Sequence, residues 1–213
     1  MIHPATCVRV VDSVIGEGVF ATEFIPRGTV VWVLCRFDRV IDRSELAGWP
    51  ERVRRAAERY GYIDSRGRLV VCWDHARLVN HSCDPASIGV GNAFEIARRD
   101  ILPGDQITCD YGLLNMTSCL ECHCGSAVCR GVVRAQDAGS LEESWDLWAR
   151  DAFAAALTVK QPLLPYVHAD NAEDSAILDA LGRGVALPLP SARLLLRAPV
   201  EAPSEAGCLW SSP

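Results

Sequence analysis

Residues 78–85 concentrate groups that can do chemistry. An apolar pair, Leu78 and Val79, is followed directly by an amide, an imidazole, a hydroxyl, a thiol and a carboxylate, and then by a proline. Burial of the apolar pair draws Asn80 and His81 inward, and a buried polar group without a hydrogen-bond partner costs about 1–3 kcal/mol. The stretch therefore predicts either a turn whose polar groups are all satisfied or a functional site.

A second polar stretch follows a strand-like segment. Residues 104–111 read Gly-Asp-Gln-Ile-Thr-Cys-Asp-Tyr, so a turn leads into a short apolar run that ends in Asp110 and Tyr111. Taken alone, Tyr111 is most simply an ordinary tyrosine at a strand end, and Asn80 with His81 is most simply a satisfied turn. The two stretches carry more weight together, because they occur in order ahead of a cysteine cluster.

Cys122, Cys124 and Cys129 have the spacing C-x-C-x4-C, with a glycine inside the longer interval that permits a tight turn. Thiolates spaced in this way can surround one zinc ion, which takes four ligands in structural sites. Cys119 is a local candidate for the fourth ligand, whereas His123 is awkwardly placed to bind the same ion. Ten cysteines in a chain with no evident export signal favour metal binding or buried thiols over disulfides.

The composition is that of a globular protein, since 49% of the 213 residues are hydrophobic and 23% are charged. No apolar run reaches the ~18–20 residues that span a bilayer, and the first residues do not resemble a secretion signal. The net charge of -6 argues against direct nucleic-acid binding and suits a basic protein or peptide as partner. Lys160 is the only lysine, and this preference for arginine suits a bacterial, cytoplasmic protein; a nuclear location is the alternative in a eukaryote.

The elements that must position these groups are mainly strands. β-branched residues predict strands at residues 8–11 and 30–34, and a Gly-x-Gly turn made by Gly16, Glu17 and Gly18 lies between them. Residues 62–64 and 69–73 predict a hairpin, and residues 89–101 predict one or two strands with Phe94 and Ile96 pointing inward.

Helical spacing appears at residues 44–61, where Pro50 suits a first helical position and an apolar face includes Val53 and Tyr60. Ser140 and Glu143 form a capping-box pattern ahead of an apolar stripe that continues to residue 156, and residues 171–181 predict a further helix. Residues 186–213 are rich in Pro, Ala and Ser and predict a loosely ordered tail.

Together these motifs resemble the SET-domain protein lysine methyltransferases. The similarity covers roughly residues 6–134 and rests on the Gly-x-Gly segment, on residues 80–85, on Asp110-Tyr111 and on the cysteine spacing followed by Arg130-Gly131. It implies an α+β, mainly β, SET-domain (β-clip) fold with knot-like C-terminal threading. It implies a SET domain at residues 6–113 and a post-SET zinc segment at 118–134, to which we add a helical extension at 139–185.

The resemblance also implies a reaction, in which S-adenosylmethionine donates a methyl group to the ε-amine of a lysine in a protein substrate. Such a transfer needs position, a dry pocket and a neutral amine. Tyr111 would be the catalytic residue, and Phe94 and Ile96 would line the substrate channel. The cofactor would be bound by Gly16, Glu17, Gly18, Asn80, His81 and Tyr111. Zn²⁺ would be held by Cys83, Cys122, Cys124 and Cys129, with Cys119 as the alternative fourth ligand.

Two positions depart from the family's pattern. Ala86 stands where an asparagine side chain usually supports the turn, and Ile96 falls where an aromatic residue is often credited with limiting the number of methyl groups. An aliphatic residue there leaves room for di- or trimethylation. Ala86 keeps open a second hypothesis, a catalytically weak or inactive SET-like zinc-stabilised module that binds peptides. A plain zinc-ribbon interaction protein is a third hypothesis, but it leaves residues 1–80 unexplained.

Overall fold

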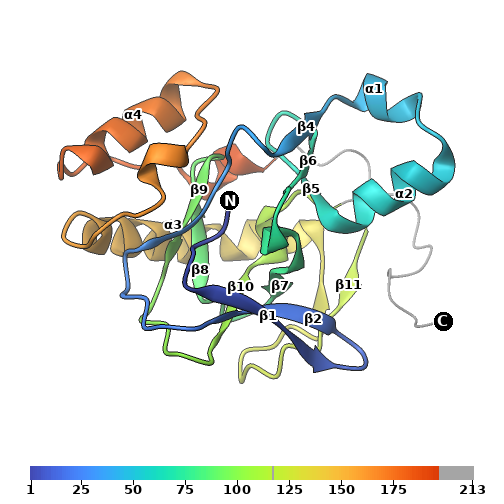
Figure 1. Ribbon diagram of the computed structural model, residues 1–213, viewed down its shortest axis with the longest axis horizontal. Coiled ribbons are helices and arrows are strands. Elements are labelled where there is room, and N and C mark those ends of the chain that lie inside the picture. The colour runs from blue at the N-terminus through green and yellow to red at the C-terminus, as the bar shows by residue number, and fades with distance from the viewer. Residues whose placement is uncertain (117, 197–213) are drawn as a thin grey trace.

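The computed structural model describes residues 1–116 and 118–196 (Figure 1). Most of the predicted tail, from residue 197 onward, lies outside the described residues. No helix in the described part of the chain is both long enough and apolar enough to cross a bilayer. The helices are α1 (Arg43–Ala47), α2 (Glu51–Tyr60), α3 (Ala138–Ala156) and α4 (Ala172–Gly182). The strands are β1 (Thr6–Asp12), β2 (Gly16–Ala21), β3 (Val30–Val33), β4 (Arg39–Ile41), β5 (Gly61–Ile63), β6 (Leu69–Val71), β7 (Asn80–His81), β8 (Ser87–Val90), β9 (Phe94–Ala97), β10 (Gln106–Cys109), β11 (Leu120–Glu121) and β12 (Val132–Val133).

The described strands form three small sheets and one two-stranded ribbon. The sheet orders are β1-β2-β10-β7, β3-β9-β8 and β4-β6-β5, and β11 pairs with β12. β10 pairs antiparallel with β2 and parallel with β7, where Thr108 lies opposite Asn80 and Cys109 lies opposite His81. The two polar stretches of the sequence, which are far apart along the chain, are therefore neighbours in one sheet.

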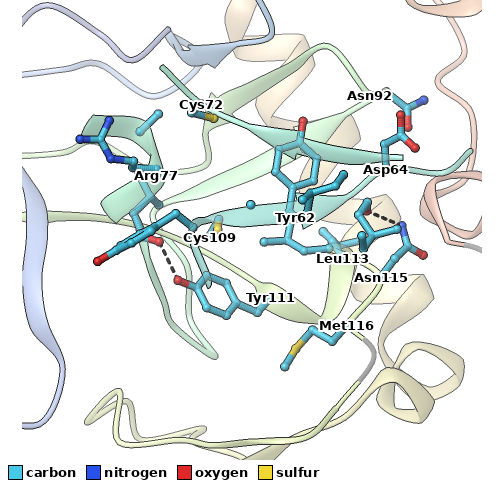
Figure 2. Close-up of a pocket in the computed structure, with 18 of the residues that line it drawn as sticks. Tyr62, Asp64, Cys72, Arg77, Asn92, Cys109, Tyr111, Leu113, Asn115 and Met116 are labelled. Carbon is cyan, nitrogen blue, oxygen red and sulfur yellow. Dashed lines mark hydrogen bonds between the residues drawn. The ribbon is translucent and has the colours of Figure 1, made fainter. Parts of the chain in front are cut away.

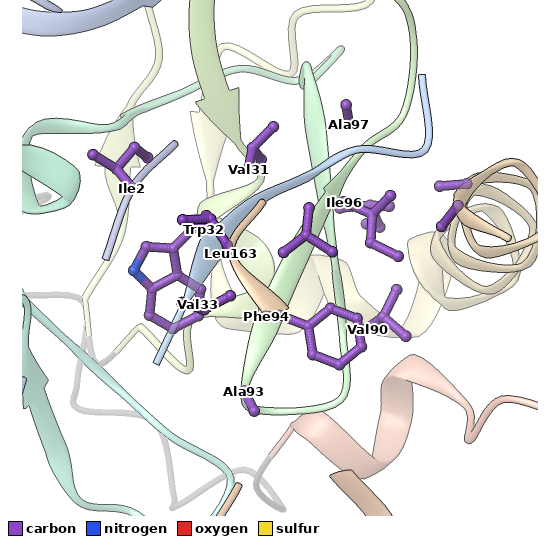
Figure 3. Packing of buried hydrophobic residues seen from close by; sticks show 14 of the residues in the cluster. Ile2, Val31, Trp32, Val33, Val90, Ala93, Phe94, Ile96, Ala97 and Leu163 are labelled. Atoms are coloured by element: carbon purple, nitrogen blue, oxygen red, sulfur yellow. The ribbon is translucent and has the colours of Figure 1, made fainter. Parts of the chain in front are cut away.

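The main core lies between the β3-β9-β8 sheet and α3, which runs behind the strands (Figure 1). Phe94 and Ile96 are among its fully buried residues, as Figure 3 illustrates. From α3, Trp145 and Phe153 are buried in the same cluster. The apolar stripe predicted for this helix is confirmed, and so are the strands predicted near residues 8–11 and 30–34.

The segment after α3 is packed into the domain. Gly91 has a φ of +69°, and a side chain at this position would lie 2.1 Å from the carboxylate of Asp174 at the start of α4. The Asn92 amide donates a hydrogen bond of 2.9 Å to Asp174. Gln161 accepts a hydrogen bond of 2.8 Å from the amide of Val30 in β3. These contacts tie the helical extension to the strands on which the candidate site is built.

Two helix predictions need correction. The helix predicted to start at Pro50 is α2, which begins directly after it and follows the shorter α1, but Val53 and Tyr60 on the predicted inner face are 49% and 43% exposed. α2 packs on β5 and β6 of the small β4-β6-β5 sheet, whose buried cluster is limited to Ile41, Leu46 and Leu69 among the described residues, so it has no deep core to bury that face. α3 begins at Ala138, ahead of the predicted cap at Ser140, whose hydroxyl donates within the first turn.

The buried stripe of α3 carries a first prediction. Phe153→Ala should lower the free energy of unfolding by about 3–5 kcal/mol, because it removes a ring that is only 3% exposed and leaves a cavity. Leu147→Ala, on the same helix but 51% exposed, is the matched control and should change stability by about 0.5 kcal/mol or less. Urea unfolding followed by circular dichroism measures both. Equal losses in the two variants would contradict the packing of α3 described above.

Candidate active site

β10 forms a wall between two cavities. Side chains alternate along a strand, and here Gln106 and Thr108 line a cavity of about 320 Å³. Ile107 and Cys109 line a second cavity of about 740 Å³ on the other face. β7 extends the same wall, since Asn80 borders the smaller cavity.

The smaller cavity lies between the β1–β2 hairpin and the wall. Apolar side chains reach it from the hairpin, and polar groups reach it from the wall and from the cysteine-rich segment. Its lining residues include Val11, Asp12, Ile15, Asn80, His81, Ser82, Asp84, Gln106, Thr108, His123 and Cys124. The Nε2 of Gln106 is buried and has no hydrogen-bond partner among the described residues. A donor left without a partner in a mixed apolar and polar cavity fits a bound ligand that accepts a hydrogen bond.

The Gly-x-Gly segment at the start of β2 packs against this wall. Asn80 donates a hydrogen bond of 2.9 Å from Nδ2 to the carbonyl oxygen of Glu17. A Cβ on Gly18 would lie 2.8 Å from Asn80 Nδ2 and 2.5 Å from Gln106 Nε2, so only glycine fits without displacement. Gly16 has a φ of +82°, which glycine adopts without strain. The tight turn predicted at Gly16–Gly18 lies instead at residues 13–15, and both glycines belong to β2, where this segment contacts Asn80, which was predicted to bind the same ligand.

His81 is held in one tautomer. Its Nδ1 accepts a hydrogen bond of 3.2 Å from the amide of Tyr111, so the ring proton belongs on Nε2, which lies 3.3 Å from Cys83 Sγ. Burial lowers the pKa of His81 to about 4, although Asp110 opposes this effect. At neutral pH the ring is therefore uncharged, and it links the tyrosine segment to the cysteine cluster.

Tyr111 borders the larger cavity (Figure 2). Its hydroxyl donates a hydrogen bond of 2.8 Å to the carbonyl oxygen of Val79, drawn as a dashed line in Figure 2. Burial raises the pKa of Tyr111 well above its ordinary value, and Cys109 and Glu95 add to the effect. The phenol is therefore a neutral donor at physiological pH, and its oxygen and the Val79 carbonyl lie side by side.

The two residues predicted for the substrate channel lie in different places. Phe94 lines the larger cavity, but Ile96 is not among the described residues that do so. Ile96 is buried in the main core. Its neighbour Glu95 points to the opposite face of β9, as strand alternation requires, and Glu95 does line the cavity. The reasoning about methyl number that rested on Ile96 therefore no longer holds.

Ala86 does not leave the turn unsupported. Its amide donates a hydrogen bond of 3.0 Å to Thr108 Oγ1, and its carbonyl accepts one of 2.8 Å from the amide of Arg98. The residue is fully buried, so a larger side chain has no room there. Thr108 on β10 supplies the polar contact to this turn, where the family pattern has asparagine.

Four thiols meet beside this site. The sulfur atoms of Cys83, Cys122, Cys124 and Cys129 all lie within 4.8 Å of one another, and Cys83 Sγ is 3.8 Å from Cys122 Sγ. A tetrahedral zinc site with Zn–S bonds of about 2.3 Å has sulfur–sulfur separations of about 3.8 Å. The donor set and its spacing therefore fit one zinc ion. Cys119, the alternative fourth ligand, is not in this group.

The Cys83 sulfur accepts hydrogen bonds that favour a thiolate. The backbone amide and Nε of Arg130 both lie 3.3 Å from it. The amide of Cys83 itself donates to Cys124 at 3.5 Å, and the Gly131 amide donates to Cys129 at 3.4 Å. Amide donors directed at several sulfurs are the support that a metal-bound thiolate cluster needs.

Asp110 is a site residue whose role the sequence did not reveal. The buried carboxylate accepts hydrogen bonds from Gly112 N at 2.9 Å, Arg130 Nη2 at 2.5 Å and Trp145 Nε1 at 3.1 Å. Trp145 lies on the apolar stripe of α3, and nothing in its helical spacing signals a polar contact. Arg130 follows the cysteine spacing directly, which was the one available hint.

Charges around the larger cavity are mixed in sign. Its lining includes Arg54, Arg55 and Arg59 from α2 together with Glu58. Arg54 and Arg55 pair with acidic residues on the same helix. The acidic surface expected to attract a basic peptide is therefore not concentrated at this opening.

Comparisons with known proteins agree with the resemblance inferred from the motifs. The family model described as "SET domain" matches residues 16–112. Histone-lysine N-methyltransferase TRX1 of Oryza sativa subsp. japonica is 37% identical over 70 residues, which cover 30% of this chain and 7% of that protein. The H3 lysine-4 specific histone-lysine N-methyltransferase of Cryptococcus neoformans is 31% identical over 136 residues, which cover 56% of this chain and 9% of that protein.

Among solved structures, the methyltransferase domain of human histone-lysine N-methyltransferase SETMAR aligns with a TM-score of 0.44 and 20% identity. The alignment covers 63% of this chain and 58% of that one. The chain spans less than a tenth of the length of the curated relatives it matches. The family match agrees with the mixed strands and helices described above and with the resemblance read from the motifs. Residues 16–112 of this chain match the family model of the SET domain.

Proposed function

We propose that the chain is a protein-lysine N-methyltransferase that uses S-adenosylmethionine. The observation that carries this proposal is the wall formed by β7 and β10, which has a cavity on each face. A donor and an acceptor held on opposite faces of such a wall can react only where it is thinnest. We place that point beside Tyr111 and the Val79 carbonyl, which are hydrogen-bonded to each other and border the larger cavity.

The smaller cavity is assigned to the cofactor. Its lining includes Gln106, whose Nε2 has no partner among the described residues, and Asn80; Gly16, Glu17 and Gly18 are not in this lining but pack behind Asn80 and Gln106 at the start of β2. S-adenosylmethionine would supply an electrophilic methyl group on a positively charged sulfur. Asn80 and His81 would orient it, and the charged residues of the lining are Asp12, Asp84, Asp105 and Arg99.

The larger cavity is assigned to the substrate lysine. Tyr111 would bind the amine or the methyl group through its neutral hydroxyl, and the Val79 carbonyl would accept weak C–H hydrogen bonds from the methyl group. Tyr62 and Phe94 contribute apolar walls that exclude water. The printed names of the relatives specify histones, and for this chain we propose a lysine-bearing protein without naming it.

Zn²⁺ is assigned to Cys83, Cys122, Cys124 and Cys129. Bound there, it would hold the segment after β10 against β7, and Cys124 and His123 from that segment border the cofactor cavity. The post-SET segment at 118–134 would thus complete the cofactor site. The alternative of a non-catalytic peptide-binding module is not favoured, because Tyr111 is in place and the turn at Ala86 is held by other hydrogen bonds.

Methyl transfer is tested with purified protein, labelled S-adenosylmethionine and a panel of histones and other lysine-rich proteins. Tyr111→Phe should lower kcat about a hundredfold or more, because loss of the hydroxyl misplaces the reacting groups. Tyr166→Phe, which alters an exposed tyrosine outside both cavities, should retain wild-type kcat. Lys160→Arg removes the only lysine and with it any automethylation signal. Unchanged transfer by Tyr111→Phe would remove the role assigned to this residue.

The Gly-x-Gly segment gives a separate prediction for cofactor binding. Gly18→Ala should weaken S-adenosylmethionine binding about tenfold, because the new Cβ would displace Asn80 and Gln106. Gly139→Ala, in the first turn of α3 with open space around it, is the matched control and should bind normally. Isothermal titration calorimetry measures both affinities. Normal binding by Gly18→Ala would mean that the cofactor does not use this segment.

The metal assignment predicts one zinc per chain by elemental analysis. Cys83→Ser should reduce the metal content well below one, since it removes one of four ligands, whereas Cys7→Ser, outside the cluster, should keep it. Chelation of the wild-type protein should also lower its Tm, because the ion joins two distant segments. Full metal content in Cys83→Ser and loss in Cys119→Ser would instead support the local four-cysteine arrangement.

A further inference from the structure

We propose that Glu95 is the group that accepts the proton of the substrate lysine before methyl transfer, an inference that rests on the function proposed above. The methyl acceptor must be a neutral amine, but a lysine side chain reaches the cavity as an ammonium ion. The Tyr111 hydroxyl stays protonated, because its pKa is raised, and it donates a hydrogen bond to the carbonyl oxygen of Val79. It is therefore poorly suited to act as the base, and another acceptor is needed.

The face of β9 that carries Glu95 opens onto the larger cavity. In the sheet register, Glu95 lies opposite Gly89 of β8 and opposite Trp32 of β3. Gly89 has no side chain, and no atom lies within 4 Å of where its Cβ would be. Both Gly89 and Glu95 line the cavity. The carboxyl group therefore has open space beside it on the β8 side, large enough for the end of an amine-bearing chain.

The hydrogen bonds around Glu95 suit both of its protonation states. Ser87 Oγ lies 2.6 Å from Glu95 Oε2 and 3.1 Å from the carbonyl oxygen of Thr108. A hydroxyl has a single proton to donate. With Glu95 ionised, Ser87 donates to the carboxylate; with Glu95 protonated, the acid donates to Ser87, which then donates to Thr108. Ser87 can therefore stabilise the base before and after it takes up a proton.

Other parts of the cavity are lined by Arg43, Arg54, Arg55, Arg59 and Arg77, but the pKa of Glu95 is shifted by burial and by Ser87 and not by an arginine. Tyr62 on β5, Cys109 on β10 and Tyr111 just after β10 interact electrostatically with Glu95. These three residues and Cys72 line the same cavity (Figure 2). Burial raises the pKa of Glu95, and the hydrogen bond from Ser87 only partly opposes this. Repulsion from Glu95 in turn helps to raise the pKa of Tyr62, Cys109 and Tyr111. An entering ammonium ion would pair with this carboxylate.

The proton balance is complete without a further reactant. The ammonium gives its proton to the Glu95 carboxylate, which leaves a neutral amine and a carboxylic acid. Burial favours this pair, since it disfavours both charged forms. The amine lone pair then forms the N–C bond while the methyl–sulfur bond breaks and the sulfur keeps that electron pair. Glu95 finally releases its proton to water, so each transfer yields one proton.

A pH profile separates this role from a merely structural one. At pH 7 the kcat/KM of Glu95→Gln should be at least about tenfold below wild type, because general-base catalysis typically contributes that much or more. The deficit should shrink as the pH approaches about 10, where lysine in solution loses its own proton. Wild type should lose activity as the pH falls through the raised pKa of Glu95. Glu143→Gln, exposed on α3, should follow the wild-type profile. A pH-independent deficit, or none, would overturn the proposal.

An amine probe tests the site without methyl transfer. Butylamine at pH 7 should bind wild type at least about tenfold more tightly than Glu95→Gln, whereas 1-butanol should bind both alike. Gly89→Val keeps Glu95 but fills the space beside it, so it should also lose butylamine binding. This variant provides a second test if Glu95→Gln folds poorly. Equal butylamine affinity in wild type and both variants would overturn the inference. Selective butylamine binding by a wild type that transfers no methyl group would instead reject the proposed function and leave the amine site standing.

Discussion

The buried carboxylate of Asp110 is the constraint on which the candidate site depends. It accepts hydrogen bonds from the chain segment just after β10, from the segment after the cysteines and from α3, through Gly112, Arg130 and Trp145. Breaking a buried charge pair by removing one partner costs about 3–5 kcal/mol. Tyr111 follows Asp110 directly, so its position is fixed by three parts of the chain at once. Arg130 also reaches Cys83, which couples the cysteine cluster to the same carboxylate.

The period of a β-strand explains how one short segment serves two cavities. Gln106 and Thr108 point to one side of the wall and Ile107 and Cys109 to the other, because successive side chains alternate. Parallel pairing with β7 then sets Asn80 beside Thr108. A shift of one residue would exchange the two linings. The hydrogen bonds of Asp110 and Thr108 on either side of Cys109 oppose such a shift.

The sequence predicted what depends on local spacing. The glycine motif, the two polar stretches and the thiols are recognisable because each is a short motif with a chemical reason for its residues, and the structure brings Cys83 to the later three thiols. It could not predict which face of β9 meets the cavity, since Phe94, Glu95 and Ile96 differ only in strand register. Trp145 was equally hidden, because helical spacing identifies a buried face but not the hydrogen bond that one indole nitrogen makes.

Burial affects the Tyr111 phenol and the Glu95 carboxyl group of the larger cavity in the same direction but leaves them with different roles. It raises the pKa of both Tyr111 and Glu95, which start from very different ordinary values. The same shift keeps the phenol protonated and moves the carboxylic acid towards the range where it can exchange a proton near neutral pH. The Tyr111 phenol acts as a hydrogen-bond donor, and the Glu95 carboxylate accepts the proton that a buried ammonium ion must lose. Burial of the cavity therefore has two effects: it excludes water from the reaction, and it raises the pKa of the base, Glu95.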